Sequence, residues 1–404
     1  MCSLRQRLWD VGGVGVGLAL GYTSPAGPAL QRPPLQLDGG QVSLVGAAVP
    51  LGALLGALVC GWAMDRFGRR DTMVACNVPA VVGWLLVGFA DGFGMLVAGR
   101  LLTGLTAGVA TVVAPTYVGE VCEPRIRGAL GAAFQLLIVF GIFLSYLIGK
   151  YAQWNHLAMA STALPVLWLL LALTLRRSPV WLLEKSREEE ALSSLVWLRA
   201  PRADVSSELS GIAEQIEEAH RKRVSFRDLA KRDNRRQFAL SLMLMLLQQL
   251  SGINAVLFYT TGIFQDAGST VEPDLATIVV GLVIVLSTLV SVVLVDRLGR
   301  RVLLLASDAI MTLCLLTLGV FFQLKSSDSA DGLGWLPLVS LMLYVFSFSI
   351  GFGPIPWLMM SKSLMGFWSI PLPMLTRSIM CPVSSCVSYS ITTADVSRSA
   401  IIDI

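Results

Sequence analysis

The chain has 404 residues, of which 54% are hydrophobic and only 14% are charged, and its formal net charge is +4. Soluble domains are about a quarter charged, so this composition excludes an ordinary soluble protein and indicates one that lies in lipid. The mild charge, without a basic stripe interleaved with aromatic residues, argues against nucleic acid as a partner. The seven cysteines and two histidines form no metal-binding pattern, so we expect neither a metal site nor a cofactor.

Ten apolar stretches, each long enough to cross a bilayer, follow one another along the chain. A hydrocarbon core of about 30 Å needs roughly 20 apolar residues per spanning helix. The sequence therefore predicts an all-α membrane protein with spans at 11–30, 42–64, 73–90, 93–118, 129–148, 156–175, 238–264, 275–295, 302–324 and 335–360. The polar stretch 176–237 interrupts the series, and its opposite charges at i,i+4 spacing predict short helices at the membrane surface.

A charged hexapeptide occurs twice, as DRFGRR at 65–70 and as DRLGRR at 296–301. The first copy joins spans two and three, and the second joins spans eight and nine. Because each copy has the same place in its half, the pattern predicts two parallel helical repeats around a linker. The expected divisions are an N-terminal six-helix half, a linker, an incomplete C-terminal half of four helices and a divergent tail, at 1–175, 176–237, 238–361 and 362–404.

Most Lys and Arg residues outside the spans fall on the side of the two hexapeptides and the linker. The positive-inside rule places that side, and with it both termini, in the cytoplasm. Glu120 and Arg127 follow span four on the same side. They are candidates for an ion-pair network with the hexapeptide loops that exists in one conformation only, although a topological anchor explains these charges equally well.

Amide side chains gather inside two of the predicted spans. Gln248, Gln249 and Asn254 lie within seven residues of span seven, and Gln135 lies in span five. An amide both donates and accepts hydrogen bonds, which suits a ligand made of hydroxyl groups. Amides can also hold helices together in lipid. Their density favours a polar binding cavity.

The end of span ten, GFGPIPW, predicts a broken helix because Pro354 and Pro356 cannot continue a regular one. Broken helices occur at membrane depth where they line a cavity. Trp357 could stack on a pyranose ring there, or equally belong to an interfacial aromatic belt. Span one has no acid after Asp10, and Asp308 is expected at the membrane interface, so passive transport is favoured over proton coupling.

GRLLTG, RGALG, QQLSGINA and GPIPW, together with the paired DRxGRR loops, resemble motifs of the sugar porters of the major facilitator superfamily. Longer stretches are most like the facilitated glucose transporters of vertebrates. The resemblance implies twelve helices in two halves and alternating access to a central site for a hexose. It also implies a monomer in the plasma membrane or an endosomal or lysosomal membrane, with no enzyme activity.

The family's functional positions are carried over motif by motif. The positions that match its sugar contacts are Gln135, Gln248, Gln249, Asn254 and Trp357. Tyr259 matches an aromatic residue near its extracellular gate, to which we add the helix-breaking Pro354 and Pro356. The positions that match its cytoplasmic charge network are Asp65, Arg69, Arg70, Glu120, Arg127, Asp296, Arg300 and Arg301.

Three departures from the family pattern qualify this prediction. Ile284 stands where the family usually has a polar residue, and RRSPVW at 176–181 lacks the acid and the arginine of the family motif, so a weaker inward latch is expected. After WLMMS the resemblance stops, and the last two family helices are not recognisable. The alternative reading is therefore a truncated, non-transporting or regulatory form of such a carrier, and a proton-coupled symporter is less favoured.

Overall fold

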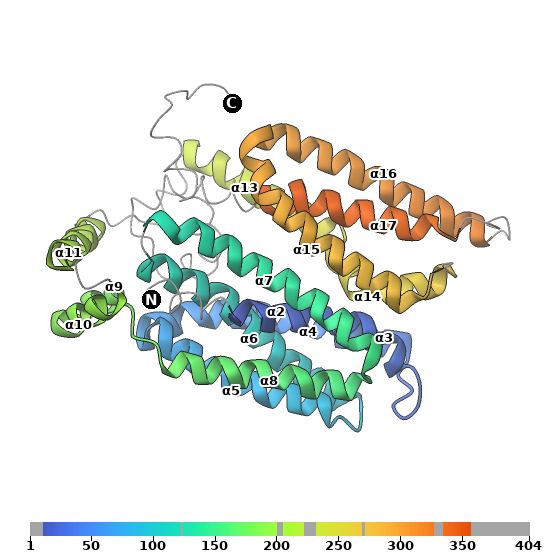
Figure 1. The fold of residues 1–404 in the computed structure, drawn as a ribbon, viewed down its shortest axis with the longest axis horizontal. Helices are drawn as coiled ribbons and strands as arrows, with labels where there is room; N and C mark the ends of the chain where they lie inside the picture. Colours follow the sequence, from blue (N-terminus) through green and yellow to red (C-terminus); the bar gives the residue numbers. More distant parts are fainter. Residues whose placement is uncertain are drawn as a thin grey trace.

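The computed structural model describes residues 11–122, 124–199, 205–221, 232–268, 271–326 and 334–356, which form a helical bundle (Figure 1). The all-α membrane fold expected from the sequence is confirmed for these residues. Trp357 and the divergent tail lie outside the described residues. Nine helical spans of the described part are long and apolar enough to cross a membrane, and one of them, Ala239–Ala267, contains a break. The remaining predicted span, 11–30, is made of two shorter helices.

The first group of helices comprises α2 (Val11–Gly21), α3 (Thr23–Leu30), α4 (Gly39–Phe67), α5 (Arg69–Gly88), α6 (Phe93–Val121), α7 (Pro124–Tyr151) and α8 (Trp154–Leu173). The break between α2 and α3 falls at Tyr22. Pro25 explains it, because proline has no N–H to donate to the carbonyl of Gly21 four residues earlier. We call this group, α2–α8, the N-half.

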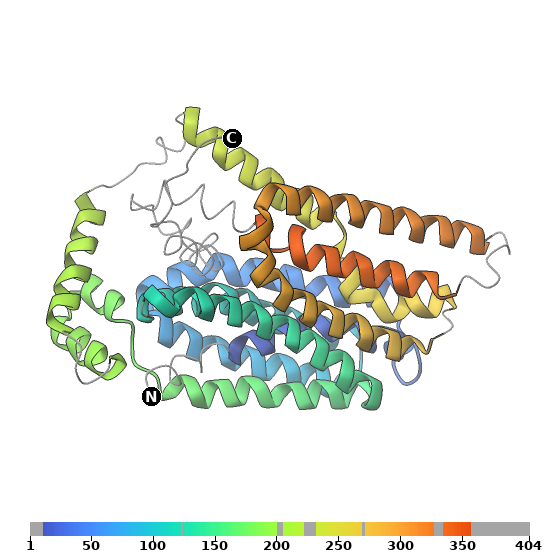
Figure 2. The same cartoon turned by 45° about the horizontal axis from the view of Figure 1, so that its top comes forward.

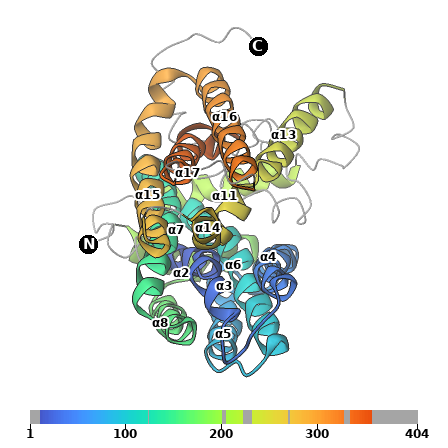
Figure 3. The same cartoon turned by 90° about the vertical axis from the view of Figure 1, so that its right-hand side faces the viewer.

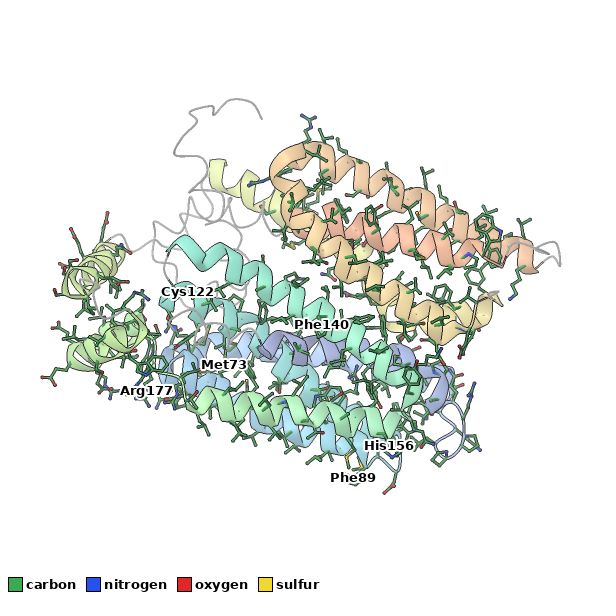
Figure 4. The ribbon with its side chains drawn as sticks, in the orientation of Figure 1. Met73, Phe89, Cys122, Phe140, His156 and Arg177 are labelled. Carbon is green, nitrogen blue, oxygen red and sulfur yellow. The ribbon has the colours of Figure 1, made fainter. Side chains whose placement is uncertain are left out.

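Three short helices follow the N-half: α9 (Pro179–Glu184), α10 (Glu188–Leu198) and α11 (Val205–Arg221). Ser178 begins α9 by accepting a hydrogen bond from the Trp181 N–H, and Pro179 fills the first position, where a missing N–H costs nothing. Figure 2 shows the three helices at one end of the bundle, which we call the linker end. In Figure 4, Arg177 lies towards this end and His156 towards the opposite one, the far end.

The second group, the C-half, comprises α13 (Arg232–Leu250), α14 (Ile253–Ala267), α15 (Pro273–Leu298), α16 (Arg300–Ser326), α17 (Leu336–Ser347) and a π-helical turn η1 (Phe348–Phe352). The two hexapeptides end α4 and α15 and begin α5 and α16. Their glycines, Gly68 and Gly299, have φ of +87° and +79°. That region suits glycine because it has no Cβ, so the same residue makes the same turn in both halves.

Close crossing of α4 and α6 organises the interior of the N-half. A Cβ on Gly52 or Gly56 of α4 would meet the carbonyl oxygen of a leucine on α6, and one on Gly108 would meet the carbonyl oxygen of Ala53. Small residues at such a crossing let two backbones approach closely, which is how membrane helices gain packing contacts.

The two halves meet along α7 and α15, and α14 packs against α3 and α2. In the end view of Figure 3 these helices lie between the rest of the N-half and the rest of the C-half. At the far end an ion pair of 2.8 Å joins Lys150 of α7 to Glu272 before α15. At the far end, α3 of the N-half and α14 of the C-half are therefore in contact, so the two halves are closed against each other there.

We expect Gly108→Ala to lower the free energy of unfolding by about 1–3 kcal/mol, because the added methyl group overpacks the crossing of α4 and α6. Gly94→Ala is the matched control on the same helix, since a Cβ there meets nothing within 4 Å. Thermal unfolding in detergent measures both variants. Equal melting temperatures for the two would contradict the close crossing.

Candidate functional site

The predicted amide cluster lies where the seventh predicted span breaks. Gly252, with φ of +83°, separates α13 from α14. Tyr344 of α17 donates a hydrogen bond of 2.9 Å to the Ser251 carbonyl, and the Ser251 hydroxyl donates one of 2.7 Å to the Gln248 carbonyl. The break is therefore fixed by a side chain of a neighbouring helix, which holds the amides in defined positions.

Gln248 supports the broken helix at the end of α17. Its amide nitrogen donates to the carbonyl oxygens of Phe352 at 2.8 Å and Gly353 at 2.7 Å. Pro356 has no N–H with which to satisfy the Phe352 carbonyl four residues earlier, and Gln248 takes that place. Both amide protons of Gln248 are thus engaged, and its side chain is buried. A ligand could reach only its oxygen.

The other proline, Pro354, has the same consequence two residues earlier in the chain. Pro354 cannot donate to the Ile350 carbonyl, and the Ser291 hydroxyl of α15 lies 3.3 Å from that oxygen. Ser291 was not singled out by the sequence, although a serine in an apolar span is a visible signal. The predicted break at Pro354 and Pro356 is therefore held by side chains from two other helices, α13 and α15.

Gln249 and Asn254 point their polar groups at one another and are not covered by other side chains among the described residues. The Asn254 amide nitrogen donates to the Gln249 side-chain oxygen at 2.8 Å, and both residues are exposed. Gln135 is exposed on α7, the helix that contacts the C-half through α15. The pair leaves the Gln249 NH₂ group and the Asn254 oxygen for a ligand, which is a donor and an acceptor side by side.

Ile284, where the resemblance expected a polar residue, is buried in the apolar core of the C-half with Val280 and Met311. Tyr259 lies at the contact of the halves. Its hydroxyl would be 3.1 Å from a Cβ on Gly46 of α4, so the ring of this C-half residue reaches the N-half. That location suits the gate role implied by the resemblance.

The charges at the linker end form a cluster between the N-half and the linker helix α9. Arg69 is almost fully buried, with its Nη2 atom 2.6 Å from Glu120 Oε1 and its Nη1 atom 3.8 Å from Glu184. The Ser178 hydroxyl donates to the other oxygen of Glu120 at 2.6 Å. Ser178 belongs to RRSPVW, so this departure from the family motif still contributes a contact. Sequence reasoning missed both Ser178 and Glu184.

The other predicted charges have different surroundings. Arg70 donates to the carbonyl oxygens of Ala172 and Leu173 at the end of α8, a favourable place for a cation, and the Asp65 carbonyl accepts from the Trp181 indole. Arg300 and Arg301 begin α16, and Arg301 is exposed. The side chains of Arg127 and Asp296 lie outside the described residues.

Arg100 of GRLLTG was quoted as part of a motif, but it was not recognised as a site. It is fully buried and donates through Nη2 to the Ala19 carbonyl and the Thr23 hydroxyl, both at 2.8 Å. Its guanidinium carbon lies 4.9 Å from the centre of the Tyr22 ring. The Nε and Nη1 atoms have no hydrogen-bond partner among the described residues. An arginine inside an apolar run is the signal that could have identified it.

Two of the pockets among the described residues lie away from the predicted sugar contacts. One of about 30 Å³ lies inside the N-half between α2, α5, α6 and α8, beside Asn77 and Trp168. The other, of about 160 Å³, opens at the far end between Arg32, Gln153, Gln265 and Asp274. None of the predicted amides lines either of these pockets: Gln135, Gln249 and Asn254 lie on exposed helix faces, and Gln248 is buried.

We expect Gln248→Ala to destabilise the protein by about 1–3 kcal/mol, because the buried carbonyls of Phe352 and Gly353 lose their donor. Gln249→Ala, at the adjacent exposed position, should leave the melting temperature nearly unchanged. Thermal unfolding in detergent distinguishes the two. A larger loss for Gln249→Ala would show that the supporting role is assigned to the wrong amide.

We expect Glu120→Gln to cost about 1.5–3 kcal/mol of unfolding free energy, since the buried Arg69 loses a charge-assisted hydrogen bond. Glu190→Gln is the control, because its pair with Arg187 is exposed and such pairs contribute roughly 0–1 kcal/mol. Unfolding curves at low and high salt measure both. Similar losses for the two variants would argue against a buried cluster.

Comparisons with known proteins bear on this arrangement. The model of the family described as "Sugar (and other) transporter" matches residues 17–364. The chain is 42% identical over 363 residues to the facilitated trehalose transporter Tret1 of Polypedilum vanderplanki. The matched region covers 88% of this chain and 72% of that protein. It is 41% identical over 363 residues to Tret1 of Anopheles gambiae, covering 88% of this chain but only 46% of that protein.

Solved structures share the arrangement of helices. The inward open conformation of the xylose transporter XylE from E. coli superposes with a TM-score of 0.76 at 20% identity, covering 99% of this chain and 91% of that one. Its partially occluded inward open conformation gives a TM-score of 0.75 at 22% identity, over 96% and 90% of the two chains. At this identity the likeness concerns the fold.

Proposed function

Since this chain belongs to the sugar transporter family and is a multi-pass membrane protein of the major facilitator fold, we propose that it carries sugars down their concentration gradient by alternating access. The observation that carries the proposal is a set of exposed amides: Gln135 on α7 and Asn254 on α14, two helices at the contact of the halves, and Gln249 at the end of α13, to which Asn254 donates a hydrogen bond. Hydroxyl groups of a sugar would exchange water hydrogen bonds for amide ones there.

Within this set the amides have separate roles. Gln249 and Asn254 offer a donor and an acceptor from the C-half, and Gln135 offers both from the N-half. A sugar held between them contacts both halves at once, which is the requirement for coupling its binding to their movement. Gln248 acts as a positioning residue, because its donors are used on Phe352 and Gly353.

The substrate we propose is a hexose, as the facilitated glucose transporters suggest. Trehalose is the second candidate, because the relatives from Polypedilum and Anopheles are named facilitated trehalose transporters. The chain spans 72% of the first relative and 46% of the second, so their whole length is not represented here. Both sugars present hydroxyl groups to amides, and uptake measurements must separate them.

Transport without a proton is supported by the partners of Arg100. Proton coupling needs an ionisable partner at membrane depth. Arg100 instead donates to a threonine hydroxyl and a backbone carbonyl, neither of which titrates near neutral pH. The relatives are named as facilitated transporters, whereas a structural neighbour is described as a proton:xylose symporter. We also propose that the basic linker end faces the cytoplasm.

Uptake of radiolabelled glucose and of trehalose by the purified chain in proteoliposomes tests the function. We expect saturable uptake of glucose that an imposed pH gradient does not drive above equilibrium. Accumulation driven by the gradient would favour a symporter, and saturable uptake of trehalose alone would replace the hexose. Absence of uptake with either sugar, from protein that is folded, would favour the non-transporting alternative.

We expect Gln249→Ala to raise the half-saturation concentration for the transported sugar about two- to tenfold, which corresponds to one net hydrogen bond. Gln215→Ala is the matched control, because Gln215 is an exposed amide on the linker helix α11. Concentration-dependent uptake measures both variants. An unchanged value for Gln249→Ala would remove Gln249 from the site.

A further inference from the structure

Two helices of the N-half, α7 and α3, contact the backbone of α14 at two residues that are four positions apart. The Leu257 carbonyl and the Thr261 N–H stand four residues apart, so they are the acceptor and donor of a single step of the helix. The Tyr146 hydroxyl of α7 donates to the Leu257 carbonyl at 2.6 Å. The Thr261 N–H donates to the Ser24 hydroxyl of α3 at 3.1 Å.

The surroundings of this step are closed and polar. The Ser24 and Thr261 hydroxyls lie 3.1 Å apart, and the Thr261 hydroxyl lies 3.0 Å from the hydroxyl of Thr277 on α15. Ser24, Tyr146 and Thr261 are each at most 1% exposed. A Cβ on Gly281 would lie 2.9 Å from the Tyr146 ring, so the missing side chain of Gly281 leaves the space in which that ring lies.

From this geometry we propose that Tyr146 and Ser24 are gating residues that hold the far end of the two halves closed through the backbone of α14. The inference rests on the proposed alternating access, because it assigns the contacts that one of its two states must break. The gate is reversible for a structural reason. Leu257 and Thr261 lie within the continuous helix α14, so when the halves separate their backbone groups keep their partners within the helix and opening orphans neither of them.

Other buried tyrosines show why this contact is suited to gating. Tyr117 donates to the Arg176 carbonyl at 2.8 Å, and Tyr344 donates to the Ser251 carbonyl. Each of these hydroxyls bonds a backbone oxygen on its own side of the molecule, where movement between the halves does not stretch it. The Tyr146 bond crosses from the N-half to the C-half, so its length follows their separation.

The closed far end also has an ion pair, Lys150 with Glu272, but the Glu272 side chain is 59% exposed. Exposed pairs contribute little to an equilibrium. The bonds of Tyr146 and Ser24 are buried, where an interaction is less screened by water. We therefore assign the larger bias toward the closed far end to the bonds on α14.

Electron–electron distance measurements on the full chain in lipid nanodiscs test the gate. Spin labels at Ser43→Cys and Leu275→Cys report the separation of the far ends, because both positions are exposed there on opposite halves. The background replaces those native cysteines that react with the label. The ratio of long to short distances measures the open and closed populations.

Tyr146→Phe keeps the ring and removes the hydroxyl, so the open-to-closed ratio should rise about two- to tenfold, as expected for one net hydrogen bond. Ser24→Ala should shift the ratio in the same direction, and it serves if Tyr146→Phe fails to fold. Tyr117→Phe, which loses a comparable bond within the N-half side of the molecule, should leave the ratio unchanged.

An unchanged ratio in both Tyr146→Phe and Ser24→Ala would overturn the gate, and so would an equal shift in Tyr117→Phe. The outcome is separable from the proposed function, because the distance measurement contains no sugar. Shifted distances in a chain without sugar uptake would retain the gate and reject the transport proposal. Normal sugar uptake with unshifted distances would retain the transport proposal and reject the gate.

Discussion

The structure depends on one constraint, which is that no water satisfies the backbone inside a bilayer. Every helix break at membrane depth must therefore find its hydrogen-bond partners within the protein. The prolines at the end of α17 free the carbonyls of Ile350 and Phe352, and Ser291 and Gln248 occupy those positions. At Gly252 the Tyr344 hydroxyl does the same for Ser251. The irregular backbone of the C-half is thus held by side chains of three other segments, which fixes the amides between them.

The same constraint connects the interior of each half to the movement between them. Glycines let α4 and α6 touch through their backbones, which packs these two helices of the N-half closely together. Where the halves meet, the bonds on α14 use backbone groups that also have hydrogen-bond partners within their own helix. A contact of this kind can form and break without a large penalty, whereas a buried group left without a partner would prevent opening.

The sequence was informative where one residue type is required by geometry. The glycines of the paired hexapeptides predict the two turns, and Pro354 and Pro356 predict the break, because backbone conformation limits the choice there. It was less informative for Gln248, which was grouped with Gln249 although its donors hold two carbonyls. Adjacent residues on a helix face different neighbours, and only the packed structure shows which neighbour each one meets. Ser178 was missed for the same reason, whereas Arg100 and Ser291 are polar residues inside apolar spans, which is a signal that the sequence does offer.

Arg100 has a consequence for the energetics of the cycle. Its guanidinium is bonded to Ala19 and Thr23 of its own half, so in the proposed alternating access this charge would stay with the N-half. A neutral solute that passes this charge carries no net charge across the bilayer, and the membrane potential does work only on charge that moves across the bilayer. For the sugar transport proposed above, solute concentrations on the two sides would then drive turnover, with little direct contribution from the membrane potential.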